Sequence, residues 1–536
     1  MKSVGARRDS GGPERIEVDG GSAVRTDFAT RSVSRWCRVA TVVVVALACN
    51  AGVANAEASD TAPLRRAAQA DFSGLDGVEA FRRMHEKIAA EYAFTEWKGV
   101  DWPALRARIL PLIEAATAAR DAEAYRAALQ AYVAGLDDGH VNLPRNETVA
   151  PVIDALTARA SGATFGIGLV ELDDARVIAA SVAPSGPAAR AGVRPGDEVV
   201  RWGDRPTAEA IGAVDLGRLA AAARVATDVH RRLEQARLIT RAPVGAAVEI
   251  ELSGEAGSAP RRVRLVAESD GPEALRDLAP RLDPGEAPIT SRRVGRFGYI
   301  RLTILADLAD LGRWPEAIWA AYRRALLRFR AAGVDGLVLD LRGNHGGWDL
   351  LAMRICGTLR RTPTFYEATV FYDADTGRFR RFTVDDRTGA VVEGLTVTPE
   401  KPTFAGPVVA LVDPMTISSG EGLARCVRER PGGATLGFHG TRGSFGLAGG
   451  EIRLPGGNVV HYPDGRAVDR DGTVLIDSRR GVGGVAPTIR VPVTRETAMA
   501  KARGEDVELA AAFAFLDRAS AEPSKARRMG GSRPPR

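Results

Sequence analysis

The stretch that decides the fold reads Leu411-Val412-Asp413-Pro414-Met415-Thr416-Ile417-Ser418-Ser419-Gly420-Glu421. An apolar strand, residues 408–412, runs into a turn of small residues, and a helix is predicted to begin at about Glu421. A strand-to-helix turn of this kind can expose one hydroxyl and aim backbone N–H groups beside it, as acyl transfer requires. It can equally be an ordinary loop in which Ser418 caps a helix. The rest of the chain decides between these two interpretations.

Length and composition predict a globular protein of several domains. The chain has 536 residues, of which 45% are hydrophobic and 26% charged, enough to build sizeable cores. The isoelectric point of about 9.3 arises from the two ends of the chain. Residues 1–56 and 518–536 hold the excess positive charge, and the net charge of residues 57–517 is about −2. Binding to nucleic acid is therefore not implied.

The first 56 residues have the layout of an export signal, with an unusually long polar leader. Three arginines within residues 31–38 precede an apolar run, residues 39–48, and Ala54-Asn55-Ala56 follows as a cleavage site. The apolar run is too short to span a bilayer. We therefore expect an exported protein, periplasmic or secreted, without a membrane span. A lipid anchor at Cys49 is a minor alternative.

Cysteine and histidine usage argues against a metal site. Cys37 and Cys49 leave with the signal, and the spacing of the remaining Cys356 and Cys426 does not by itself predict a bridge. The chain contains no C-x-x-C and no H-E-x-x-H motif among its six histidines. We expect no metal and no organic cofactor.

Pattern changes along the chain divide it into successive regions. Apolar residues at helical spacing predict a helical region within residues 57–150, and residues 160–268 contain short strands, glycine turns and a strongly helical run. Residues 290–495 alternate strand and helix, as in an α/β layer. The polar, basic end, residues 517–536, is predicted to be disordered.

Four motifs together resemble known families. The text from Gly186 to Val200, with Phe165-Gly166-Ile167-Gly168, resembles a PDZ domain. The S41 peptidases, which are the C-terminal-processing and tricorn-core-like proteases, have a D-L-R-x-N-x-G-G element, an S-x-x-E nucleophile turn and a G-V-x-P-D closing strand. Their counterparts here are residues 340–347, residues 418–421 and residues 484–492, with Thr488 where Asp is usual. Lys98-Gly99-Val100-Asp101-Trp102 and Asp138-Gly139-His140 are typical of the tricorn-like branch.

The resemblance covers roughly residues 76–516 and implies a fold class. We expect a mixed α/β (α+β) protein with a ClpP/crotonase-like S41 catalytic core, residues 290–495. A PDZ-like domain, residues 160–268, is inserted before it, and a helical cap, residues 57–150, precedes both.

The residue inventory then selects one branch of the family. Processing proteases pair their serine with a lysine about 25 residues later, but no lysine occurs between positions 402 and 500. Arg442 cannot replace it, because a guanidinium does not lose its proton in proteins. The tricorn-like branch uses a Ser–His–acid arrangement, so His140 is the expected general base for Ser418. His439, which lies near the position of the missing lysine, is the rival.

The remaining site residues follow from the same resemblance. The acid that orients the imidazole is expected at Asp477, with Asp469 and Asp471 as alternatives. Backbone N–H groups of Ser419 and Gly346 are the candidate oxyanion hole. Asp340, Arg342 and Glu421 are expected to build the scaffold of the site.

The loop Phe165-Gly166-Ile167-Gly168 would offer N–H groups to the C-terminal carboxylate of a peptide that adds as a strand. The other interpretation of this region is a domain that only supports the active site or mediates assembly.

The leading functional hypothesis is an exported serine endopeptidase acting on polypeptides, with the PDZ-like module presenting or gating the substrate. The alternative is a catalytically silent S41-like scaffold that binds peptides or apolar ligands, which the missing lysine and Thr488 motivate. The substrate, the choice between C-terminal trimming and internal cleavage, and the oligomeric state stay open at this stage.

Overall fold

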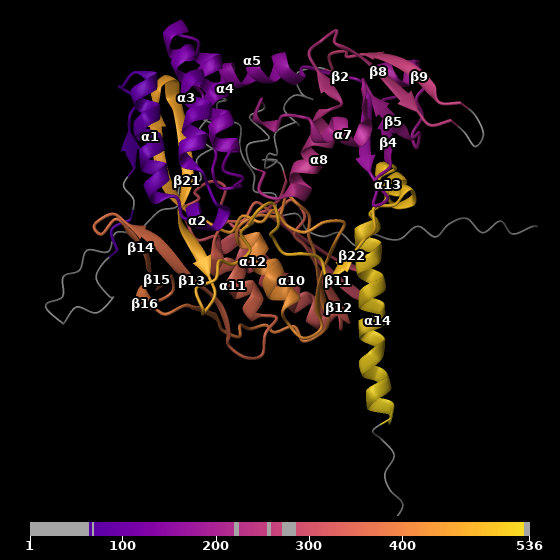
Figure 1. Ribbon diagram of the computed structural model, residues 1–536. Helices are drawn as coiled ribbons and strands as arrows, with labels where there is room; N and C mark the ends of the chain where they lie inside the picture. Colours follow the sequence, from indigo (N-terminus) through magenta and orange to yellow (C-terminus); the bar gives the residue numbers. More distant parts are fainter. Residues whose placement is uncertain (1–63, 67–68, 219–224, 255–258, 271–285, 530–536) are drawn as a thin grey trace, which may run out of the picture.

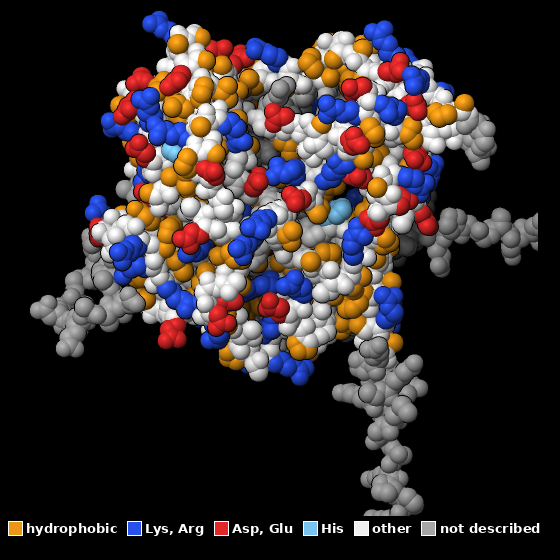
Figure 2. All heavy atoms as spheres, in the orientation of Figure 1, with side chains coloured by type: hydrophobic (Ala, Val, Ile, Leu, Met, Phe, Trp, Pro, Cys, Tyr) orange, Lys and Arg blue, Asp and Glu red, His pale blue; other side chains and the backbone are white. Residues whose placement is uncertain are grey.

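The computed structural model describes residues 64–66, 69–218, 225–254, 259–270 and 286–529 (Figure 1). The predicted signal, residues 1–56, and the alternative anchor at Cys49 lie outside this part. Within it, no helix combines the length and the apolar character needed to cross a membrane. Acidic and basic side chains are interspersed over the face shown in Figure 2, so no field of one sign marks this face as a surface for nucleic acid.

The amino-terminal region is helical, as its apolar spacing predicts. Asp76, Asp101 and Asp121 each accept hydrogen bonds from first-turn N–H groups, so an aspartate N-cap starts each of three helices. The elements are β1 (Ala70–Asp71), α1 (Gly77–Glu91), α2 (Thr95–Lys98), α3 (Trp102–Ala119), α4 (Ala122–Ala134) and α5 (Ala150–Ser161).

The next region is a small β-rich unit in which helix α8 lies beside strand β3. Strands β3 and β4 form an antiparallel pair, and a four-stranded sheet has the order β6-β5-β8-β9. The elements are β2 (Ala163–Thr164), β3 (Ile167–Glu171), β4 (Val177–Val182), α6 (Pro187–Arg190), β5 (Val199–Trp202), β6 (Arg205–Pro206), α7 (Thr207–Gly212), a 3₁₀ turn (Leu216–Arg218), α8 (Asp228–Leu238), β7 (Arg241–Ala242), β8 (Ala247–Leu252) and β9 (Arg261–Val266).

The core of the third region is a six-stranded sheet with the order β10-β11-β12-β18-β19-β22, parallel except at β10. Helices α10, α11 and α12 cover one face and α13 and α14 the other, which explains why β12 and β18 are buried throughout. The elements are β10 (Ile289–Val294), β11 (Phe297–Leu302), α10 (Glu316–Ala331), β12 (Gly336–Asp340), α11 (Asp349–Gly357), β18 (Val408–Leu411), α12 (Ser419–Arg428), β19 (Gly433–Gly437), β22 (Ile489–Arg490), α13 (Arg495–Ala502) and α14 (Val507–Met529).

A second sheet joins this core to the helical region. Its hairpin β20–β21 contributes Ile452, Leu454, Val460 and Tyr462 to the same hydrophobic cluster as α1, α3 and α4. The helical region therefore shares its core with residues far along the chain. The sheet consists of β1 with β13 (Thr364–Asp373), β14 (Arg378–Arg381), β17 (Leu395–Val397), β20 (Leu447–Leu454) and β21 (Asn458–Val468), and a 3₁₀ turn (Pro455–Gly457) joins the last two. Strands β15 (Thr383–Asp385) and β16 (Ala390–Val392) form a separate two-stranded sheet.

The carboxyl-terminal end differs from the prediction. Residues 517–529, expected to be disordered, continue helix α14, which projects from the body of the molecule in Figure 1. Its first half packs Ala512 and Leu516 against the parallel sheet. The stretch beyond contains helix-forming Ala, Arg, Lys and Glu, and the helix runs on through Pro523 to Met529.

Cys356 and Cys426 form a disulfide between helices α11 and α12, with their Cα atoms 6.2 Å apart. Both side chains are buried in the cluster beneath the parallel sheet. The bridge closes a sequence separation of 70 residues, which restricts the unfolded chain. It also ties together the two helices that follow β12 and β18.

Replacing both cysteines by serine should lower stability by roughly 2–4 kcal/mol. Thermal unfolding of the purified protein, followed with and without a thiol reductant, measures this. The reductant should lower the melting temperature of the wild type and leave that of the double variant unchanged. A double variant that melts with the oxidised wild type would contradict a stabilising bridge.

Candidate active site

Two turns meet at the carboxyl ends of adjacent parallel strands. Asp340 at the end of β12 pairs with Leu411 at the end of β18. The chain then enters the turn 341–348 in one case and 413–418 in the other. Asp413 binds the turns together, because its Oδ1 accepts hydrogen bonds from the N–H of Gly343 (2.9 Å) and of Thr416 (3.0 Å). Ligand and catalytic groups commonly gather at such an edge of a parallel sheet.

Ser418 has a strained backbone conformation, with φ 58° and ψ −133°. A non-glycine residue rarely adopts this conformation, and it is not the extended conformation of an ordinary N-cap serine. Its N–H donates to Ser444 O (3.0 Å) and to Glu421 Oε2 (3.2 Å), and its side chain is partly exposed. A Cβ added at Gly346 would lie 2.6 Å from Ser418 Cβ, so only glycine fits opposite this serine.

Glu421 is the centre of a buried hydrogen-bond network. Besides the Ser418 N–H, its carboxylate accepts from the N–H of Gly443 (2.7 Å) and Ser444 (3.0 Å) and from the hydroxyl of Thr441 (2.5 Å). Burial raises the pKa of Glu421 to about 7, although each of these bonds lowers it. The carboxylate thus holds the nucleophile turn against the loop 441–444, as expected of a scaffold residue.

Asp340 and Arg342 also act as scaffold. Arg342 forms a two-bond ion pair with Asp340 (3.0 and 2.7 Å) and a second one with Asp506 (2.8 Å each). The Tyr299 hydroxyl donates to Asp340 (2.7 Å). These contacts join the end of β12 to the start of α14.

The predicted oxyanion donors have different surroundings. Ser419 begins α12, where the first N–H groups of a helix have no partner within the helix, and it is fully buried. The Gly346 N–H, in contrast, donates to Asn344 Oδ1 (2.9 Å). To act as an oxyanion donor, Gly346 must exchange this bond for one to the substrate.

His140 lies on a loop that packs against the nucleophile turn. The N–H of Gly139 donates to Ser444 Oγ (2.9 Å), and a Cβ at Gly139 would lie 3.0 Å from Ile417, the neighbour of Ser418. The His140 N–H donates to Asp138 Oδ1 (2.8 Å). The structure therefore brings the loop of the expected base to the turn of the expected nucleophile.

Asp477 is buried beside the same loop. Its Oδ2 accepts a hydrogen bond from the N–H of Phe445 (3.0 Å), and no described residue donates a hydrogen bond to its Oδ1. Burial raises its pKa well above the usual range, and the neighbouring carboxylate of Asp138 raises it further. The alternatives Asp469 and Asp471 lie in a turn after β21, where Asp469 Oδ1 accepts from the N–H groups of Asp471 and Thr473 (2.9 Å each). The surroundings favour Asp477 as the acid.

The rival base, His439, has a different set of charged neighbours. Burial lowers the pKa of His439, and the charge of Arg490 lowers it further. Asp173, which pairs with Arg490 (2.7 Å), opposes this effect. These neighbours belong to the β3–β4 turn and to β22 and are not part of the Ser418 turn.

Arg442, near the position of the family's lysine, braces the nucleophile turn. Its Nε donates to Pro414 O (3.1 Å) and its N–H to Thr416 O (3.0 Å). Thr488, the other departure from the motif, exchanges hydrogen bonds with Thr435 on β19 (2.9–3.0 Å). At both positions where the sequence differs from the family pattern, the side chain therefore makes contacts that hold neighbouring segments together.

The loop Phe165-Gly166-Ile167-Gly168 uses part of its donor capacity inside the fold. The Phe165 N–H donates to Thr240 O (3.0 Å) and the Gly166 N–H to Thr164 Oγ1 (3.0 Å). Phe165 and Ile167 point into a hydrophobic cluster. An ion pair between Arg232 on α8 and Glu171 on β3 (2.5 Å) connects this helix to the strand that follows the loop.

Known proteins resemble this chain in sequence and in fold. The family model described as Peptidase family S41 matches residues 296–491, a range that lies inside the predicted catalytic domain. This range of the chain is similar to peptidase family S41. It includes the two turns described above, at the ends of β12 and β18.

Individual proteins are similar to this chain in sequence and in fold. It is 28% identical over 228 residues to Carboxyl-terminal-processing peptidase 2, chloroplastic, of Arabidopsis thaliana, covering 41% of this chain but only 36% of that relative. The solved structure of mature CPAF is similar in fold, with a TM-score of 0.54 at 13% identity, and covers 85% of this chain and 98% of that one. Mature CPAF complexed with lactacystin gives a TM-score of 0.52 at 13% identity, with 83% and 97% covered.

Several residues of the site were not found from the sequence. Asn344 is fully buried. Its side-chain amide donates to Leu302 O (2.8 Å) and accepts from the Gly346 N–H. Its main-chain carbonyl accepts a hydrogen bond from the Ile417 N–H (3.0 Å). Ser444 accepts from Gly139 and Ser418, as described above. Their roles depend on contacts across many residues, and only the x-N-x-G-G spacing around Asn344 gave a signal.

The buried Glu421 carboxyl should impose a pH dependence on stability. Its pKa is about 7 in the fold and 4.5 in the unfolded chain, so the folded state holds an extra proton between these values. This contribution is fully present below pH 4.5 and is lost as pH rises to 7, by up to about 3 kcal/mol. Melting temperatures from pH 4.5 to 8 for the wild type and Glu421→Gln should show a flatter profile in the variant. Parallel profiles would contradict a raised pKa at Glu421.

Proposed function

We propose that this chain is an exported serine endopeptidase that hydrolyses peptide bonds of polypeptides with a Ser–His–acid site. The observation that carries the proposal is the conformation of Ser418, held at positive φ at the start of α12 and facing Gly346. A scaffold that maintains such strain at a serine, with a histidine loop packed against it, favours a nucleophile.

The proposed mechanism assigns each group one role. Ser418 Oγ attacks the scissile carbonyl while the imidazole of His140 takes its proton and then delivers it to the leaving amine. Water then attacks the acyl-enzyme while His140 takes a proton from the water and returns it to Ser418 Oγ. This step releases the carboxylic acid product and restores the free serine. Asp477 orients the imidazole and stabilises its charged form, and the N–H groups of Ser419 and Gly346 receive the oxyanion.

Export and domain roles are part of the same proposal. A disulfide between α11 and α12 suits an oxidising compartment, in agreement with the signal layout of residues 1–56. The core would have the ClpP/crotonase-like arrangement, and the region 160–268 would be a PDZ-like module that presents or gates the substrate.

One observation favours the alternative of a silent scaffold that binds peptides or apolar ligands. The Gly346 N–H is engaged by Asn344 Oδ1 and so is not presented to a substrate in this conformation. A peptidase resolves this by exchanging the bond when the substrate binds, whereas a scaffold has no need to.

Covalent labelling with a fluorophosphonate probe distinguishes the two functions without knowledge of the substrate. The wild-type protein should label at Ser418, and Ser418→Ala should abolish labelling. His140→Ala should reduce the rate by at least about 10³-fold, as loss of a triad base does. Ser444→Ala is the matched control for a nearby serine, and its product should still carry the label at Ser418. A wild type that fails to label with or without added peptide would support the silent scaffold.

A further inference from the structure

Lys98 uses all three ammonium protons on two separate loops. Its Nζ donates to Asp137 O (2.9 Å), to Ser478 O (3.2 Å) and to Ser478 Oγ (2.8 Å). Asp137 lies three residues before His140, and Ser478 follows Asp477 directly. One side chain therefore bridges the loop of the proposed base and the loop of the proposed acid.

The element that carries Lys98 is short but firmly fixed. Helix α2 ends at Gly99, which has the left-handed conformation (φ 67°), and the Val100 N–H closes the turn on Thr95 O (3.0 Å). The preceding residue, Trp97, donates its indole N–H to Asp477 O (3.1 Å). Adjacent side chains of α2 thus bind adjacent main-chain carbonyls of the Asp477 loop.

The Lys98 ammonium also acts electrostatically on Asp477, in addition to its hydrogen bonds to the two loops. The carboxylates of Asp138 and Glu421 face it and disfavour its ionised form, whereas the Lys98 ammonium and the Phe445 N–H favour that form. The hydroxyl of Tyr92, which donates to Asp138 (2.7 Å), is a further titratable group near Asp477. Lys98 is the positive charge among these neighbours.

We propose that Lys98 is a positioning residue that holds the His140 loop and the Asp477 loop in register. This inference rests on the proposed Ser–His–acid function. It assigns the amino-terminal helical region, which supplies His140, a second part in the site, namely holding the loop of Asp477.

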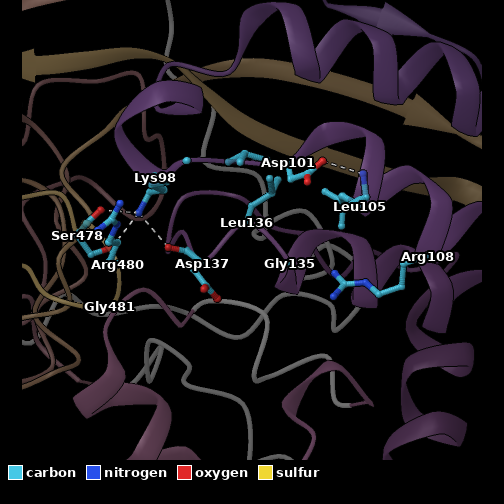
Figure 3. A pocket seen from close by; sticks show the side chains of 13 residues that line it. Lys98, Asp101, Leu105, Arg108, Gly135, Leu136, Asp137, Ser478, Arg480 and Gly481 are labelled. Carbon is cyan, nitrogen blue, oxygen red and sulfur yellow. Dashed lines mark hydrogen bonds between the residues drawn. The ribbon is translucent and has the colours of Figure 1, made fainter.

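A cavity of about 430 Å³ makes the contact accessible to a chemical test (Figure 3). Figure 3 shows Lys98, Ser478 and Arg480 together at one end of the cavity, with Arg108 apart from them. Truncation of Lys98 to alanine would open a space next to the Ser478 carbonyl that a small amine can reach through this cavity.

The experiment is amine rescue of Lys98→Ala in the full-length protein. Removing hydrogen bonds to a charged donor should lower kcat and the rate of fluorophosphonate labelling by roughly 10- to 100-fold, with KM for a peptide substrate changed less than about threefold. Loss of the ammonium should also move the acid limb of the kcat profile to higher pH. Methylammonium or ethylammonium should restore both properties in a saturable manner.

Three controls distinguish a loss of positioning from nonspecific effects of the added cation and from misfolding of the variant. Tetramethylammonium has the charge but no N–H donor, so it should not rescue. Arg108→Ala changes a residue of the same cavity that contacts neither loop of the site through a hydrogen bond, and its activity and labelling should match those of the wild type. Trp97→Phe, which removes only the indole donor, should lower kcat about 3- to 10-fold and guards against a misfolded Lys98→Ala.

Each outcome decides the inference. Wild-type labelling and an unshifted acid limb in Lys98→Ala would overturn it, as would equal rescue by tetramethylammonium. If instead Ser418→Ala is labelled like the wild type, the proposed Ser–His–acid function is rejected, whatever the result for Lys98→Ala. Loss of labelling in Ser418→Ala together with full labelling in Lys98→Ala rejects only the positioning role.

Discussion

The buried carboxylate of Glu421 is the interaction on which the site depends. It accepts from the N–H groups of Ser418, Gly443 and Ser444 and from the Thr441 hydroxyl, and so joins the start of α12 to a loop more than twenty residues later. Desolvation of this carboxylate is costly, and four donors offset that cost. A positive φ at Ser418 persists because this network over-determines the conformation of the turn.

From Glu421 the constraint spreads to the neighbouring turns. Ser444, placed by the carboxylate, accepts the Gly139 N–H through its hydroxyl and so fixes the approach of the His140 loop. On the other side, Asn344 receives the Gly346 N–H and gives its carbonyl to Ile417. The disulfide between α11 and α12 holds the helices that follow these turns. Segments from four parts of the chain thus meet at one edge of the parallel sheet.

The elements predictable from sequence were those with strong local patterns. Strands 297–302 and 408–411 and helix 316–331 are apolar runs or amphipathic stripes, and their observed bounds agree with the patterns within a few residues. The β20–β21 hairpin was missed, because Gly449, Gly450 and Pro463 interrupt the alternation that identifies a strand. Its packing with the helical region is a long-range contact that no local pattern contains.

The same distinction holds at the site. Ser418, His140 and Asp477 lie in motifs that a family resemblance can locate. The roles of Lys98, Asn344 and Ser444 depend on contacts with residues up to 380 positions away, although Lys98 itself stands in the motif Lys98–Trp102. The 6.2 Å Cα separation of Cys356 and Cys426 is likewise set by helix packing and not by their spacing in sequence.

Three carboxylates, Asp138, Glu421 and Asp477, lie buried within one site, which is an expensive arrangement for structure alone. Each has its own donors: a tyrosine hydroxyl for Asp138, main-chain N–H groups for Glu421, and a single N–H for Asp477. The last is the least satisfied, with Oδ1 receiving no hydrogen bond from any described residue. A buried carboxylate left partly unsatisfied, and opposed by two others, is poised to stabilise a positive charge that forms nearby. In the proposed mechanism the imidazole of His140 gains a proton during acyl transfer and would supply such a charge, so protonation of His140 would recover part of the cost carried by the folded protein.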